Sequence, residues 1–121
     1  MRLLSSAVLG IGALLMSACH SVSPEDAAAK EAALNEIAVG QMIAEANCSR
    51  CHAVGRSGDS PHEEAKPFRK FSENYPIRDL EEPLAEGIVV GHPDMPVFTM
   101  SPAEIDALLS YIESIQEPLG T

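Results

Sequence analysis

The pentapeptide Cys-Ser-Arg-Cys-His at residues 48–52 constrains this chain more than any other feature. C-x-x-C-H is the spacing used for covalent haem attachment, in which two thiols form thioether bonds along one edge of a porphyrin. The neighbouring imidazole can then bind the iron, a role that needs a neutral histidine. The motif therefore predicts one c-type haem held by Cys48 and Cys51, with His52 as an axial ligand of the iron.

Three other sites can be built on a C-x-x-C pair: a thiol-disulfide redox centre, half of a zinc site, or a structural disulfide. A zinc site is disfavoured because no second cysteine pair and no suitably spaced histidine pair follows. A thiol redox centre is disfavoured because no strand-like alternating run precedes Cys48 and the β-α-β pattern that presents such a pair is missing. Covalent haem attachment is therefore the preferred interpretation.

A second ligand for the iron is expected from the stretch around Met95, which lies between Pro93 and Pro96. Two prolines this close prevent a helix and favour an extended backbone. A thioether on such a stiff loop can approach the face of the iron opposite His52. Met95 is therefore the predicted second axial ligand, with Met100 and His92 as the alternatives.

The first 18 residues have the pattern of a secretory signal peptide. A short positive start is followed by an apolar run from Leu3 to Met16 and then by small residues. The run is 14 residues long and is interrupted by serines and glycines, whereas a membrane-spanning helix needs about 20 apolar residues. We therefore expect the chain to be exported to the periplasm.

Residues 15–19, Leu-Met-Ser-Ala-Cys, resemble a bacterial lipobox, whose cysteine becomes the lipidated first residue after cleavage. The cysteine count favours this interpretation. If Cys48 and Cys51 hold haem and Cys19 holds lipid, none of the three cysteines is left to mispair in an oxidising compartment. Cleavage near Ala18 by an ordinary signal peptidase is the alternative.

The residues after the signal are expected to form one small domain. We divide the chain into a signal at 1–18, a tether and helix start at 19–30, and the domain itself at 31–118. The whole chain has two Tyr, three Phe and no Trp. Such a chain gains much of its stability from burying an apolar cofactor.

Helical patterns dominate the domain. Ser23 is a candidate N-cap with Pro24 behind it, and the segment 26–46 is rich in helix formers. Gly40 costs stability within this helix, and its expected compensation is close approach of another helix. One face carries small and apolar residues at spacings of three and four that lead to the haem motif: Ala33, Ile37, Gly40, Ala44 and Cys48.

Beyond the motif, residues 53–67 predict an irregular loop that places a backbone carbonyl on the second nitrogen of His52. His62 in this loop is interpreted as a solvated side chain. Short helical stretches are expected at Phe68–Tyr75 and from Asp79 to about Val90. A capping box at 101–104 then begins an amphipathic helix that ends near Gln116, with its core face formed by Ile105, Leu108, Leu109, Ile112 and Ile115.

The formal net charge is −10, and after Arg78 the chain has nine acidic residues and no basic one. Nucleic acid is therefore disfavoured as a partner because phosphate would be repelled. The acidic balance fits electrostatic steering towards a basic protein surface, and it fits simple solubility equally well.

Residues 36–116 resemble the small single-haem cytochromes c with His and Met ligands, through C-S-R-C-H at 48–52 and M-P-V-F at 95–98. The resemblance implies an all-α fold in which the N- and C-terminal helices cross and the haem lies between helices and loops. It implies that Gly40 meets Leu108 and Tyr111 at this crossing, where Ala44 replaces a usual aromatic residue. It also implies that a proline carbonyl supports His52, with Pro61 and Pro67 as the candidates.

The expected function is that of an electron carrier and not of an enzyme. We expect a periplasmic monomer that exchanges electrons with redox proteins and contacts the membrane only through a lipid on Cys19. An alternative is a haem-bearing subunit or small-gas sensor in which Met95 leaves the iron, since Met100 and His92 lie close by in the sequence. A thiol redox protein without haem is the third hypothesis.

Overall fold

The computed structural model describes residues 23–87 and 94–118, and within these ranges every regular element is helical. This part of the chain contains no strand, so the expected all-α fold is confirmed. The elements in chain order are α1 (Pro24–Asn47), the 3-10 helices η1 (Phe68–Glu73) and η2 (Ile77–Leu80), α2 (Glu81–Glu86) and α3 (Pro102–Ser114). None of these helices is both long enough and apolar enough to cross a bilayer.

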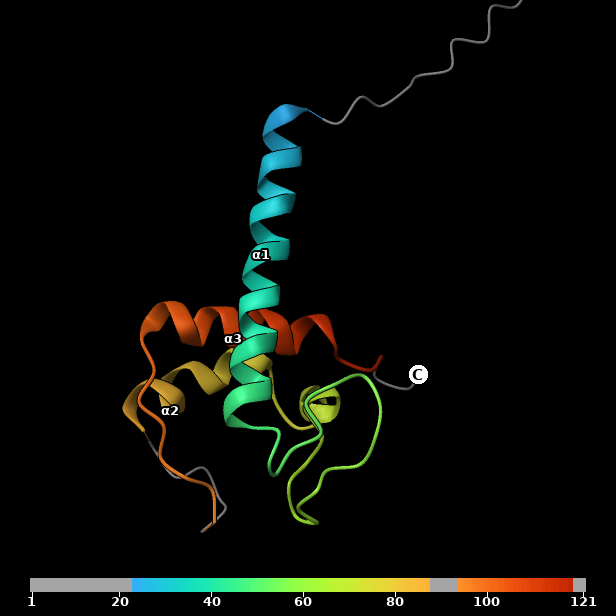
Figure 1. The fold of residues 1–121 in the computed structure, drawn as a ribbon, viewed down its shortest axis with the longest axis vertical. Helices are drawn as coiled ribbons and strands as arrows, with labels where there is room; N and C mark the ends of the chain where they lie inside the picture. Colours follow the sequence, from blue (N-terminus) through green and yellow to red (C-terminus); the bar gives the residue numbers. More distant parts are fainter. Residues whose placement is uncertain (1–22, 88–93, 119–121) are drawn as a thin grey trace, which may run out of the picture.

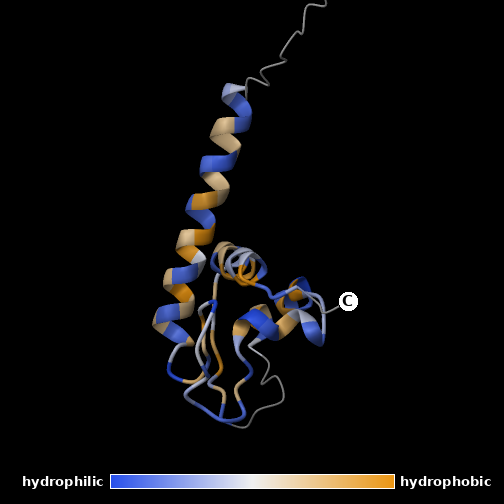
Figure 2. Ribbon diagram, turned by 90° about the vertical axis from the view of Figure 1, so that its right-hand side faces the viewer, coloured by the Kyte–Doolittle hydropathy of each residue, from blue (hydrophilic) through white to orange (hydrophobic). Residues whose placement is uncertain are grey.

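Helix α1 begins where its capping signals predict. The Ser23 hydroxyl accepts a hydrogen bond from the Asp26 N–H at 3.1 Å, and Pro24 occupies the first turn. Acidic Glu25 and Asp26 lie at the positive end of the helix dipole. Residues 24–35 are all exposed, so the first half of α1 projects away from the rest of the protein (Figure 1). Hydrophilic and hydrophobic residues alternate along the whole helix, including this projecting part (Figure 2).

The second half of α1 crosses α3, as Figure 1 shows. Gly40 lies at the crossing, where an added Cβ would be 1.9 Å from the Ala107 oxygen and 2.7 Å from Cβ of Tyr111. The expected compensation for this glycine, close approach of another helix, is therefore confirmed. The expected contact with Tyr111 is confirmed, and the nearest atoms belong to the Ala107 backbone, which the sequence did not predict.

Helix α3 supplies most of the core. Its capping box is complete, because the Ser101 hydroxyl accepts from the Glu104 N–H and the Glu104 carboxylate accepts from the Ser101 N–H at 2.8 Å. All five residues expected on its core face are at most 4% exposed. Phe68, Phe71 and Ile77 from η1 and η2 pack against them.

Helix α2 is shorter than the sequence indicated. It begins at Glu81 rather than Asp79 and ends at Glu86, whereas the pattern predicted helix as far as about Val90. Gly87 caps it with φ of 70°, a left-handed conformation that glycine adopts without strain. Residues 88–93 lie outside the described part of the chain.

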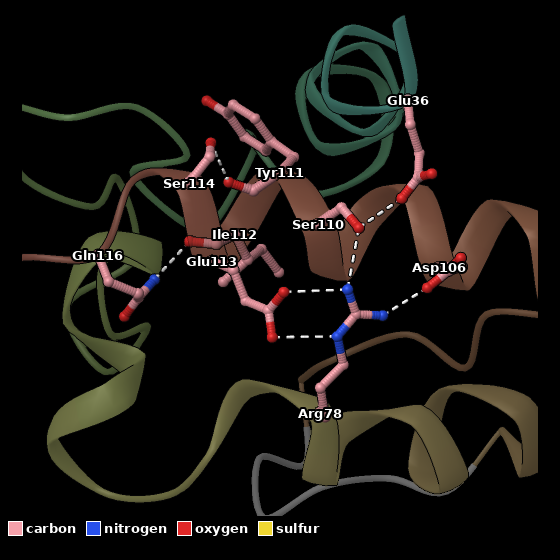
Figure 3. A network of polar contacts seen from close by, with 9 residues as sticks. All are labelled: Glu36, Arg78, Asp106, Ser110, Tyr111, Ile112, Glu113, Ser114 and Gln116. Carbon is pink, nitrogen blue, oxygen red and sulfur yellow. Dashed lines mark hydrogen bonds and ion pairs between the residues drawn. The ribbon is translucent and has the colours of Figure 1, made fainter. Parts of the chain in front are cut away.

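An ion-pair network joins η2, α3 and α1 (Figure 3). Arg78 binds Glu113 through two parallel hydrogen bonds of 3.0 and 2.9 Å, and it also binds Asp106 and the hydroxyl of Ser110. Ser110 in turn donates to Glu36 on α1. The bonds to Glu113 and Asp106 raise the pKa of Arg78 further above its ordinary value. The network fixes η2, and the start of α2 behind it, against α3.

Candidate functional site

A cavity of about 570 Å³ lies below the α1–α3 crossing and is lined mainly by apolar side chains. Its volume falls within the range of roughly 300 to 1,000 Å³ that is usual for ligand and cofactor sites. The apolar wall is built from η1, η2, α2 and α3 and includes Phe68, Phe71, Leu80, Leu84, Leu108 and Ile112. Cys48, Cys51, His52 and Met95 line the same cavity.

The C-x-x-C-H residues form one further turn beyond the end of α1. Cys48 is the C-cap residue, and its N–H donates to Ala44 at 2.9 Å. The N–H groups of Cys51 and His52 both donate to the Cys48 carbonyl, at 3.1 and 2.9 Å. This tight turn brings both thiols and the imidazole to the cavity wall. The geometry fits two thioether bonds to one porphyrin, as the spacing predicted.

His52 is held by the backbone of the loop that follows the motif. Its Nδ1 lies 2.8 Å from the carbonyl oxygen of Lys66. A carbonyl only accepts, so Nδ1 carries the proton and Nε2 carries the lone pair that a metal ion needs. This contact also raises the basicity of the imidazole as a ligand.

The supporting carbonyl therefore belongs to neither Pro61 nor Pro67, the two candidates expected from the family resemblance. Lys66 directly precedes Pro67, and a residue before proline is driven to an extended backbone. The ring of His52 also contacts Phe68 and Phe71, with ring centroids 5.1 and 5.8 Å away.

Distant parts of the chain fix the loop that carries this carbonyl. The hydroxyl of Tyr111 on α3 donates to the Val54 carbonyl at 2.8 Å. Arg56 donates to the Ser114 carbonyl at the end of α3, and Arg69 donates to the Gly58 carbonyl at 2.8 Å. The orientation of His52 thus depends on α3 as well as on the motif.

Two methionines lie on the cavity wall, Met95 and Met100, and both are half-buried. Either thioether is a chemically suitable iron ligand. His92, the other alternative expected from the sequence, and Cys19, the expected lipidation site, lie outside the described residues. The Met95 segment is non-helical, as expected, but the expected extended backbone is not found at the methionine, since Asp94 lies in a turn and Met95 in a bend before Pro96.

The environment of Cys48 disfavours a thiol redox centre. Burial, together with the neighbouring Cys51, raises the pKa of Cys48 to about 11. Catalytic thiols have a lowered pKa, because the thiolate is the nucleophile. No group of three His, Cys, Asp or Glu side chains suited to a metal occurs in residues 23–87 and 94–118.

Sequence reasoning missed one pair of polar residues at the cavity. His62, interpreted as a solvated side chain, is only partly exposed and lines the cavity, with Nε2 3.7 Å from an Asp94 carboxylate oxygen. No short-range pattern links these two positions. Only the fold brings the loop after the motif and the Met95 segment together.

The comparison with protein families agrees with this geometry. The family model for cytochrome c matches residues 37–116, which is more than half of the chain. No curated protein and no solved structure matches the chain significantly. The matched region contains the C-x-x-C-H turn, the cavity and the crossing of α1 with α3. The chain therefore belongs to the cytochrome c family, whose members carry a covalently bound c-type haem.

Proposed function

We propose that this protein is a periplasmic electron carrier, and not an enzyme, with one haem attached to Cys48 and Cys51 and bound axially by His52 and Met95. The observation that carries the proposal is that Met95, far along the chain from the C-x-x-C-H motif, lines the same cavity as its three functional residues. Bound there, the haem supplies one-electron transfer between ferrous and ferric iron.

The side chains around the cavity suit this task. The Lys66 carbonyl orients His52, and the Phe68 and Phe71 rings limit its movement. A Met95 thioether opposite an imidazole raises the potential relative to two imidazoles. The apolar part of the wall would limit the access of water to a bound haem, which would favour the less charged, reduced state.

Attachment and ligation can be tested separately on protein exported in a haem-attaching host. Cys48→Ala and Cys51→Ala should each reduce the haem that survives a denaturing gel, as detected by its peroxidase activity. Haem staining that survives the double replacement would reject thioether attachment at this motif.

Ligation is tested with Met95→Ala and with Met100→Ala as its matched control, because both thioethers line the cavity. We expect Met95→Ala to keep covalent haem, to lose the far-red sulfur-to-iron absorption band of the oxidised protein, and to lower the potential. Met100→Ala should keep the band. The opposite result would transfer the axial role to Met100.

The presence of Met100 on the cavity wall gives the second candidate function, a gas-binding haem protein, its one supporting observation. If Met95 left the iron, the Met100 thioether on the same wall would be available to replace it. Rapid formation of a carbon monoxide adduct by the reduced wild-type protein would favour this function. A six-coordinate reduced protein that resists carbon monoxide would favour the electron carrier.

We also propose that Cys19 carries lipid and that α1 acts as a spacer from the membrane. The spacer role is supported by the exposure of residues 24–35 and by the capped helix start, and the lipid by the lipobox-like sequence at 15–19. At about 1.5 Å per residue this exposed part of α1 is roughly 18 Å long. The intact mass of the exported protein reports haem, cleavage site and acyl chains together, and a mature protein that lacks Cys19 or carries no acyl chain on it would refute lipidation.

A further inference from the structure

His62 and Asp94 approach one another at a partly exposed edge of the cavity. Nε2 of His62 lies 3.7 Å from Oδ2 of Asp94, and the two side chains are 38% and 77% exposed. His62 belongs to the loop that follows the C-x-x-C-H turn, whereas Asp94 directly precedes Met95. Their contact therefore joins the two segments that would bind the iron from its two sides.

The His62 side of this contact is held firmly. Its backbone N–H donates to the Cys51 carbonyl at 3.1 Å, and its own carbonyl accepts from Ala65 at 3.0 Å. Its ring Nδ1 accepts a hydrogen bond from the Glu64 N–H at 3.3 Å. Because Nδ1 is the acceptor, the neutral ring carries its proton on Nε2, the nitrogen that faces Asp94.

The Asp94 side of the contact is coupled to the position of Met95. Adjacent Cα atoms are about 3.8 Å apart, so a displacement of Asp94 moves the start of the Met95 backbone with it. At 3.7 Å the contact is longer than a hydrogen bond, and the weaker attraction between the Nε2–H dipole and the carboxylate is present even when the imidazole is uncharged. The contact therefore needs no change in the charge of His62 to hold the segment.

We propose that His62 and Asp94 form a latch that keeps Met95 against the cavity and so limits its replacement by external ligands. The proposal assumes the axial role of Met95 described above. His62 and Asp94 are positioning residues, since neither binds the iron. An exposed pair of this kind contributes modestly, so the expected effect on ligand replacement is about 1.5-fold to 5-fold.

Imidazole binding to the oxidised holoprotein measures this effect, because imidazole must displace the thioether. We expect Asp94→Asn and His62→Ala each to tighten imidazole binding about 1.5-fold to 5-fold, and the double variant to show no more than either single change. His62→Lys, which restores a donor opposite the carboxylate, should recover part of the wild-type resistance. The far-red band should also be lost at a lower denaturant concentration in Asp94→Asn and His62→Ala than in the wild type, with His62→Lys between them.

Glu63→Gln is the matched control, because Glu63 is exposed next to His62 on the same loop, lies outside the cavity wall and loses a charge as Asp94 does. Its imidazole affinity should equal that of the wild type. Unchanged affinity in Asp94→Asn, or additive effects of the two single changes, would overturn the latch. If Met95→Ala binds imidazole no more tightly than the wild type, the axial role of Met95 fails too, which separates the two proposals.

Discussion

Gly40→Ala tests whether the approach of α1 to α3 determines the stability of this protein. The added Cβ would lie 1.9 Å from the Ala107 oxygen, 2.6 Å from its carbonyl carbon and 2.7 Å from Cβ of Tyr111. Two of these atoms belong to the backbone of α3, so no rotation of a side chain relieves the clash. The helices must move apart, and α3 carries Leu108 and Ile112 of the cavity wall with it.

Two opposing terms set the size of this effect. Alanine favours the helix by about 1 kcal/mol relative to glycine, while forcing extra volume into a packed contact costs typically about 1–3 kcal/mol. A backbone contact at 1.9 Å belongs at or beyond the upper end of that cost, so we expect a net loss of about 2 kcal/mol. For a domain of this size the loss lowers the melting temperature by roughly 8–16 °C.

Thermal unfolding of the holoprotein, followed by far-ultraviolet circular dichroism, measures the change. Gly55→Ala is the matched control, because a Cβ there meets no atom within 4 Å and should change stability by less than about 0.5 kcal/mol. A Gly40→Ala protein that melts at or above the wild-type temperature would refute the reasoning, since helix propensity would then outweigh the contact.

Three further predictions concern charge. Arg78→Met should lower the free energy of unfolding by about 1 kcal/mol, because the partly exposed Arg78 holds η2 to α3. Its control, Lys30→Met on the projecting part of α1, should leave the free energy measured by denaturant unfolding unchanged. Equal losses of stability in the two variants would contradict the role of the network. The Ser101 N–H and hydroxyl lower the pKa of Glu104 below its ordinary value near 4.5, so the capping box should stabilise the protein above that pH and lose its contribution as the pH falls through the lowered pKa. Melting curves of Glu104→Gln should therefore converge with the wild type in acid, and a constant difference at all pH values would speak against this assignment. Reduction by a basic redox protein should slow as ionic strength rises, because the net charge is −10; stopped-flow rates that do not depend on salt would exclude electrostatic steering.

Several features of the fold and the site were readable from the sequence because they depend on short-range chemistry. The C-x-x-C-H spacing, the N-cap at Ser23 and the capping box at Ser101 each involve groups within four residues of one another. The period of α3 identified its core face in the same way. Gly40 indicated a close helix contact, because a glycine inside a helix otherwise only costs stability.

The tertiary structure alone decided how distant segments meet. Lys66, and not Pro61 or Pro67, supports His52, because the path of the intervening loop is set by hydrogen bonds to α3 and η1. The Ala107 backbone lies nearest to Gly40, because the rotation of α3 about its own axis depends on the whole core. The contact of His62 with Asp94 likewise exists only when both loops are folded. Hydrogen-bonding patterns within a helical turn depend on residues close in sequence. Loop paths and helix rotations are instead set by the free energy of the entire packed domain.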